Sequence, residues 1–252
     1  MSDAREQKWH TIVTSACAVV AGAAWVYLLI GPVPGMSSSG DESVMPMQMA
    51  TAAWGVTEAL LLMMMWSAMM LAMMLPSATG ILPLLSRVGG GKNPGSTTLW
   101  FAAGYFSVWL GFSAIAAALQ LILHNMGAMS GTMRWANSYV GAALLIIAGL
   151  YQFHPLKQSC LARCRSPLDF LMTSWRAGNA GALRMGLSYG MVCTGCCWAL
   201  MLVLFVLGIM NLLVVAALSA VIVLEKMSRL GRQMSRVTGA ALIAGGLLTL
   251  AG

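Results

Sequence analysis

The chain has 252 residues, of which 59% are hydrophobic and only 8% are charged. A typical soluble domain carries about a quarter charged residues, so this composition excludes an ordinary water-soluble surface. The net charge of +7 does not indicate nucleic-acid binding, because the 14 basic residues lie in short segments between apolar stretches. The composition therefore predicts a chain that lies almost entirely in a lipid bilayer.

Apolar stretches long enough to cross a bilayer recur along the whole chain. A hydrocarbon core about 30 Å thick requires a helix of about 20 mostly apolar residues. Hydropathy predicts seven such helices, near residues 10–30, 56–76, 98–123, 136–153, 184–207, 209–225 and 235–252. The first is too long for the apolar part of an export signal and is expected to be retained. We therefore expect an all-α, polytopic transmembrane bundle that forms a single domain.

The basic residues give these predicted helices a direction, since Lys and Arg accumulate on the cytoplasmic side of membrane proteins. With the N-terminus in the cytoplasm, seven spans place every basic residue except Arg134 on the cytoplasmic side. The first exterior loop, residues 31–55, contains Asp41 and Glu42 and no basic residue. The pattern predicts a multi-pass protein of the bacterial cytoplasmic (inner) membrane.

Methionines gather in the first exterior loop, just before the second span. Met45, Met47 and Met49 form a Met-x-Met-x-Met run. In an extended segment these three side chains point the same way, so their sulfurs can converge on one soft metal ion. The alternative is a disordered loop that is rich in methionine by composition alone.

The second span itself carries seven methionines within residues 63–74. Met65, Met69 and Met73 form an i, i+4, i+8 row on one helix face, and Met70 lies on an adjoining row with Met74. Thioethers are neutral soft ligands that suit Cu(I) and are compatible with an apolar interior. The alternative is that methionine serves here as a flexible apolar filler.

Two cysteines, Cys160 and Cys164, lie in a basic segment between the fourth and fifth spans that is expected to be a cytoplasmic loop. A reducing cytoplasm disfavours a standing disulfide, which leaves metal binding or redox exchange. With a helical turn between them the two thiols share a face, and His154 is a candidate third ligand. They can also be two incidental thiols.

The fifth span contains three cysteines in five residues, Cys193, Cys196 and Cys197. The i, i+3 and i, i+4 spacings let Cys193 share a helix face with either of the others, which suits a soft metal ion. Gly195 lets another helix approach closely, and packing against the second span would bring Met and Cys sulfurs together. The alternative is ordinary packing of small residues.

Other positions are less informative. Cys17 has no polar neighbour in the first span and is expected to be a plain buried residue. Glu225 and Lys226 are consistent with an ion pair at the membrane surface. The sequence has no paired-carboxylate site, Gly-x-Ser-x-Gly elbow, phosphate loop or His-Glu-x-x-His motif, so we expect no enzyme activity.

Three blocks of the sequence carry a family resemblance. They are residues 64–77 (MMWSAMMLAMMLPS), residues 149–167 (GLYQFHPLKQSCLARCRSP) and residues 189–226, which include YGMVCTGCCWALM, GIMN and LEK. In this combination the chain resembles a bacterial family of predicted metal-binding integral membrane proteins, a domain of unknown function. The resemblance implies metal binding and a link to copper. The methionine row is also similar to the Met-x-x-x-Met of high-affinity copper uptake transporters, which are trimers of three-span chains, so neither their fold nor their pore is implied.

Three functions follow from these patterns. The leading hypothesis is binding, transport or delivery of Cu(I), in which exterior methionines collect the ion, the Met and Cys residues of the second and fifth spans hold it, and Cys160 and Cys164 receive it. A metallochaperone or a membrane complex would be the partner. The second hypothesis is a structural or assembly subunit of a membrane (metallo)enzyme complex, and the third is a thiol redox protein that uses Cys160 and Cys164.

Overall fold

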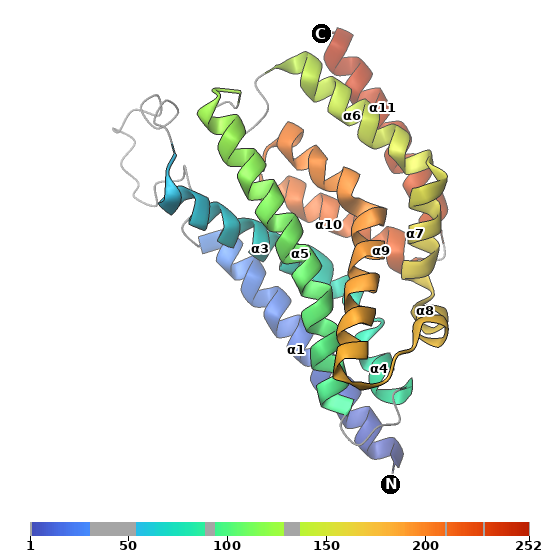
Figure 1. Cartoon of the computed structure of the whole chain (residues 1–252). Helices are drawn as coiled ribbons and strands as arrows, with labels where there is room; N and C mark the ends of the chain where they lie inside the picture. The colour runs from blue at the N-terminus through green and yellow to red at the C-terminus, as the bar shows by residue number, and fades with distance from the viewer. Residues whose placement is uncertain are drawn as a thin grey trace.

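The computed structural model describes residues 2–30, 54–88, 94–128, 137–209, 211–228 and 230–251, and every regular element in these ranges is an α-helix. The helices are α1 (Ser2–Ile30), α3 (Val56–Ala78), α4 (Leu82–Val88), α5 (Pro94–Asn125), α6 (Ser138–Phe153), α7 (Pro155–Arg165), α8 (Pro167–Ser174), α9 (Gly178–Leu207), α10 (Leu212–Met227) and α11 (Gly231–Ala251) (Figure 1). The predicted all-α class is confirmed. Each of the seven predicted spans overlaps one helix, namely α1, α3, α5, α6, α9, α10 or α11.

Five of the described helices are long and apolar enough to cross a membrane. They are Thr11–Ile30 within α1, Val56–Ala78, Gly95–Asn125 within α5, Gly178–Leu207 and Gly231–Ala251. The pair α6 and α7, bent by 61°, adds a sixth if it counts as one span. α10 has 16 residues and rises about 24 Å, less than a typical hydrocarbon core. The long apolar helices are thus compatible with membrane insertion, whereas the expected seven spans and the cytoplasmic N-terminus are not confirmed by helix length.

Local sequence explains where several helices begin. α5, α7 and α8 each start with proline, which lacks the backbone N–H that a first helical turn leaves unpaired. The side chains of Asn137 and Asn211 accept hydrogen bonds from the first turns of α6 and α10. The segment between the fourth and fifth predicted spans, expected as a cytoplasmic loop, is largely helical, because α7, α8 and the first turns of α9 occupy it.

Two glycines bring α5 and α9 into backbone contact. A Cβ atom on Gly186 would lie 2.1 Å from the carbonyl oxygen of Phe101, and one on Gly104 would lie 2.3 Å from that of Leu183. Any larger residue would push the two helices apart, as in the small-residue interfaces of membrane helices. The close approach lets side chains of α5 reach the face of α9 that carries the cysteines.

A second close pair is formed by α6 and α11, which lie side by side (Figure 1). A Cβ atom on Gly149 would lie 2.8 Å from the carbonyl oxygen of Gly239, and a Cβ atom on Gly239 would lie 2.9 Å from the carbonyl oxygen of Gly149. Small residues again set the helix separation.

The centre of the bundle lies between α3 and α9. Trp66 of α3 stacks on Phe205 of α9 with ring centroids 5.4 Å apart, and its indole Nε1 donates to Gln120 of α5 over 2.7 Å. The second and fifth predicted spans thus contact each other through the rings of Trp66 and Phe205, a contact that the sequence left open. The two ends of the chain lie at opposite ends of the bundle (Figure 1).

Candidate metal site

The three cysteines of α9 all face the interior. Cys193, Cys196 and Cys197 are each at most 2% exposed. The thiols of Cys196 and Cys197 both point toward the carbonyl oxygen of Cys193, each over 3.0 Å, because i, i+3 and i, i+4 side chains lie over the same turn. The hydroxyl of Tyr105, brought in by α5, lies 3.2 Å from the Cys193 sulfur. The expected clustering of these thiols is therefore seen.

A fourth thiol joins this group from another helix. Cys164 of α7 is buried, and its sulfur lies 3.9 Å from that of Cys196. Its backbone carbonyl accepts a hydrogen bond from the hydroxyl of Tyr189 over 3.3 Å. Lys157, Leu161 and Cys164 are the buried residues of α7 and follow an i, i+4, i+7 pattern, so they form one face of the helix. The sequence placed Cys164 in a separate site with Cys160, whereas the fold brings it to the α9 cysteines.

The ammonium of Lys226 lies at the junction of α3, α9 and α10. Its Nζ is 2.9 Å from the sulfur of Cys193, 3.6 Å from that of Met74 and 3.3 Å from the hydroxyl of Ser77. A buried cation is stable only with such polar or charged partners. The expectation of an ion pair between Glu225 and Lys226 is wrong, since Lys226 turns to the sulfurs.

Glu225 instead pairs with Lys157, over 2.7 Å, and both side chains are at most 2% exposed. Lys157 also donates to the amide oxygen of Gln152, which accepts a further hydrogen bond from Ser235 over 3.1 Å. Gln158 donates to the backbone carbonyl of Gln152 over 2.9 Å. This polar network ties α7, the helix that carries Cys164, to α6, α10 and α11.

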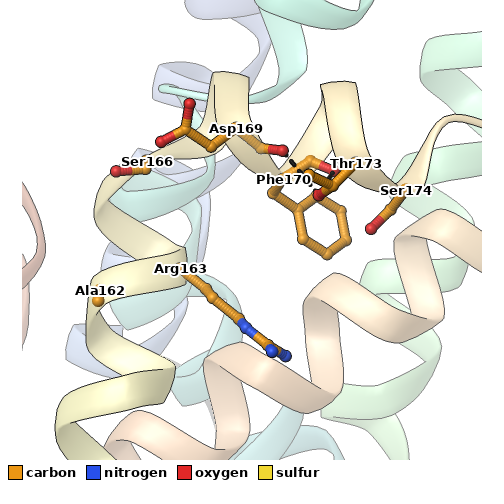
Figure 2. Close-up of a pocket in the computed structure, with 7 residues that line it drawn as sticks. All are labelled: Ala162, Arg163, Ser166, Asp169, Phe170, Thr173 and Ser174. Atoms are coloured by element: carbon orange, nitrogen blue, oxygen red, sulfur yellow. Dashed lines mark hydrogen bonds between the residues drawn. The ribbon is translucent and has the colours of Figure 1, made fainter.

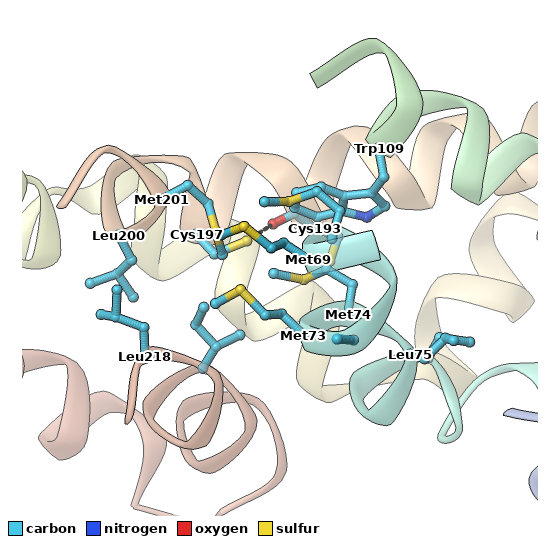
Figure 3. Packing of buried hydrophobic residues seen from close by; sticks show 14 of the residues in the cluster. Met69, Met73, Met74, Leu75, Trp109, Cys193, Cys197, Leu200, Met201 and Leu218 are labelled. Carbon is cyan, nitrogen blue, oxygen red and sulfur yellow. Dashed lines mark hydrogen bonds between the residues drawn. The ribbon is translucent and has the colours of Figure 1, made fainter. Parts of the chain in front are cut away.

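The predicted methionine row is buried in the same core. Met65, Met69, Met70 and Met73 are each at most 1% exposed. Figure 3 shows Met69, Met73 and Met74 of α3 together with Cys193, Cys197 and Met201 of α9, and all six belong to one continuous core. Thioethers of α3 and thiols of α9 thus share one region, and we call these residues together with Cys164 and Cys196 the sulfur cluster.

Two residues expected near Cys164 have other surroundings. Cys160 is partly exposed and lies beside Gly195, where a Cβ atom would be 3.0 Å from the Cys160 sulfur. Gly195 thus admits a thiol rather than a helix backbone, and its carbonyl accepts a hydrogen bond from Tyr151. The Nδ1 atom of His154 caps α7 by accepting from the Leu156 amide over 3.2 Å, so this nitrogen is already engaged.

Some of the predicted ligands are not placed. Met45, Met47 and Met49 lie outside the described residues. Within the described ranges, no group of three or more His, Cys, Asp and Glu side chains is arranged to hold a metal ion. Any ion bound in the sulfur cluster therefore needs methionine thioethers or a rotation of the thiols.

A separate cavity of about 540 Å³ opens between α7 and α8 (Figure 2). Its lining residues are Ala162, Arg163, Ser166, Asp169, Phe170, Thr173 and Ser174. It contains none of the predicted sulfur ligands, so it is distinct from the sulfur cluster.

Sequence reasoning missed Tyr105 and Lys226 as neighbours of Cys193, and Ser77 as a neighbour of Lys226. Tyr105 belongs to no motif, whereas Ser77 and Lys226 end two of the blocks that carry the family resemblance. Each of the three reaches the site only because its helix packs there. The one available signal was the position of Lys226 at the end of an apolar stretch, where a lysine usually extends to the membrane surface.

The long apolar helices and the buried thiols and thioethers define a membrane-type helical protein with a soft-ligand core. The sequence matches the PpoB2 family, described as copper chaperone, over residues 63–249. The chain therefore belongs to this family, which fits the resemblance to a copper-linked family. No curated protein and no solved structure matches the chain at a significant level.

Proposed function

We propose that the protein binds Cu(I) in the sulfur cluster and delivers it to a partner from within the bacterial cytoplasmic membrane. The observation that carries the proposal is the position of Lys226, whose ammonium touches a thiol of α9 and a thioether of α3 at once. A monovalent cation thus already lies between the two classes of soft sulfur. The copper chaperone family supports copper as the cargo.

The donor set fits a soft ion such as Cu(I) better than a hard ion. Thiolates and thioethers select soft ions, whereas Mg²⁺ and Ca²⁺ require oxygen ligands that this core does not offer. In this proposal Cys193 and Cys197 supply thiolates, and Met69 and Met73 supply thioethers. Because Cu(I) accepts few ligands, these sulfurs suffice without a group of three His, Cys, Asp or Glu side chains.

Lys226 has a second role in this proposal. Two thiolates and one Cu(I) leave a net negative charge, which is costly in an apolar interior. The ammonium offsets that charge, and the flexible stem of lysine lets it withdraw from the sulfurs without leaving the site.

The topology that supports delivery has seven spans, with the N-terminus in the cytoplasm. The placement of basic residues favours it, and the opposite positions of the chain ends agree with an odd number of crossings (Figure 1). A reporter fused after residue 252 tests it. Activity of a reporter that works only outside the cytoplasm is expected, and activity of a cytoplasmic reporter at the same position would contradict seven spans.

The binding proposal is tested by titrating anaerobically purified protein with Cu(I) against a chromogenic Cu(I) chelator. Cys193→Ser is expected to lower the affinity by about a hundredfold or more, since losing a ligand exceeds the ten- to hundredfold cost of losing a supporting group. Cys17→Ser is the matched control, because Cys17 is a buried thiol of α1 outside the sulfur cluster. Wild-type affinity in Cys193→Ser would refute the proposed site.

Lys226→Met tests the role of the ammonium separately. We expect a loss of about tenfold in Cu(I) affinity, as for other groups that support ligands, and partial recovery in Lys226→Arg. A higher affinity in Lys226→Met would instead identify the ammonium as a competitor of the ion.

The alternative of a thiol redox protein that uses Cys160 and Cys164 is disfavoured by the geometry, since Cys164 faces Cys196 and Cys160 is partly exposed. An assembly role is compatible with copper delivery to a metalloenzyme. Measuring the copper content of a co-purified partner separates the two roles. A partner that gains copper indicates assembly with delivery, and a partner that gains none indicates structural support alone.

A further inference from the structure

Two thiols of the sulfur cluster lie close together although they belong to different helices. The sulfurs of Cys164 in α7 and Cys196 in α9 are 3.9 Å apart, and both residues are buried. Neither thiol is needed as a ligand in the proposed two-thiolate site of Cys193 and Cys197. The Cys164–Cys196 pair can therefore be oxidised without removing a ligand of that site.

Helix geometry decides which cysteines can form a disulfide. A disulfide needs Cβ atoms about 3.5–4.5 Å apart, whereas residues at i, i+3 and i, i+4 of a regular helix have Cβ atoms about 5–6 Å apart. Pairing Cys160 with Cys164, or Cys193 with Cys196 or Cys197, would require unwinding a helix. Cys164 and Cys196 belong to different helices, so this restriction does not apply to them, and their sulfurs already lie 3.9 Å apart.

Cys164 also lies within interaction range of Cys193. The Cys193 sulfur, however, is held by Tyr105 and Lys226 at 3.2 and 2.9 Å. Moving it toward Cys164 would leave the buried ammonium with weaker partners. The Cys164–Cys196 pair is therefore the one favoured for oxidation.

We propose that the Cys164–Cys196 dithiol reduces Cu(II) to Cu(I) as the cargo is loaded. The inference rests on copper as the cargo of the sulfur cluster. Two Cu(II) ions each take one electron, the two S–H bonds break, one S–S bond forms between Cys164 and Cys196, and two protons leave to water. A thiol reductant returns the two electrons and restores both thiols.

The direction of this reaction follows from ligand chemistry. Thiolate and thioether ligands stabilise Cu(I) over Cu(II) and thus make Cu(II) a stronger oxidant at this site. Protein dithiols have low reduction potentials and yield electrons readily to such an oxidant. One of the two reduced ions then stays with Cys193, Cys197 and the methionines, the other is released, and the oxidised Cys164–Cys196 pair lies beside the bound ion.

The experiment mixes fully reduced, metal-free protein with two equivalents of Cu(II) sulfate under anaerobic conditions. Loss of the Cu(II) electron paramagnetic resonance signal reports reduction, and peptide mapping after alkylation locates the disulfide. We expect one Cys164–Cys196 disulfide for every two Cu(II) ions reduced. Cys164→Ser and Cys196→Ser should lose both the disulfide and the rapid reduction, whereas Cys160→Ser and Cys17→Ser should keep them.

Several outcomes would overturn the inference. They are rapid reduction in Cys164→Ser, a disulfide at a different pair, or no reduction by a wild-type protein whose Cys164 and Cys196 are bridged readily by diamide. The last measurement contains no metal and shows that the two thiols of the wild-type protein can form the disulfide. Tight Cu(I) binding without Cu(II) reduction would refute this inference alone, whereas reduction without retention of Cu(I) would refute the proposed function instead.

Discussion

Two sides of the bundle pack by different chemistry. On one side, α3, α7 and α9 meet through the sulfur cluster. In α9, 61% of an apolar stretch of 18 residues is buried inside the protein. On the other side, α6 and α11 meet through Gly149 and Gly239. Only 17% of the equivalent stretch of 18 residues in α11 is buried. A helix surrounded by neighbours can carry a site on several faces, whereas a peripheral helix fits one partner and leaves its other faces to lipid. In the proposed function, ion binding therefore belongs to the first side and structural support to the second.

The largest effect is expected at the polar network that joins the two sides. Glu225→Gln leaves the ammonium of Lys157 buried without a carboxylate, and breaking a buried pair costs about 3–5 kcal/mol. We expect a large fall in thermal stability in detergent, together with slower diamide bridging of Cys164 and Cys196, because Lys157 and Cys164 share one face of α7. The double variant Lys157→Met, Glu225→Leu should recover most of the stability. Unchanged bridging in Glu225→Gln would show that α7 is held by other contacts.

A pair of glycine substitutions tests the comparison most directly. Gly186→Ala and Gly239→Ala each place a Cβ less than 3 Å from neighbouring atoms, and overpacking costs about 1–3 kcal/mol. Both should lower the unfolding temperature. Only Gly186→Ala should also weaken Cu(I) binding, because it moves α5 and Tyr105 away from Cys193. Gly245→Ala is the control, since nothing lies within 4 Å of its added Cβ. An equal loss of Cu(I) affinity in Gly186→Ala and Gly239→Ala would contradict the functional difference between the two sides of the bundle.

A methionine substitution separates packing from binding. Met73→Leu roughly conserves volume and should cost less than about 1.5 kcal/mol of stability. It removes a thioether, however, so Cu(I) affinity in the chelator titration should fall clearly. Met191→Leu is the control on α9, because Met191 is 64% exposed. Equal Cu(I) affinities in the two variants would mean that Met73 serves only as an apolar filler.

The smallest effect is expected for Tyr105→Phe. It removes the hydroxyl 3.2 Å from the Cys193 sulfur, and a typical hydrogen bond contributes about 1 kcal/mol. Thermal stability should fall slightly and Cu(I) affinity by a few-fold, whereas Tyr139→Phe, at an exposed position of α6, should change neither. A large fall in affinity would instead make Tyr105 part of the binding site.

Much of this arrangement could be predicted. Seven predicted spans correspond to seven helices because hydropathy is a local property of about twenty residues. The spacing of Cys193, Cys196 and Cys197 likewise fixes a shared helix face. The helices α7 and α8 were missed because their segment is polar, with proline at each start, and reads as a loop.

By itself the sequence determined a helical, membrane-type chain, the family and the soft character of its buried side chains, since these depend on composition and on periods within one helix. Only the tertiary structure decided that Cys164 faces Cys196 rather than pairing with Cys160, and that Lys226 reaches Cys193 and Met74. Those contacts depend on how far apart helices pack and at what angle. Glycines such as Gly186 set the separation, and the 61° bend at α6 and α7 turns Cys164 toward the core.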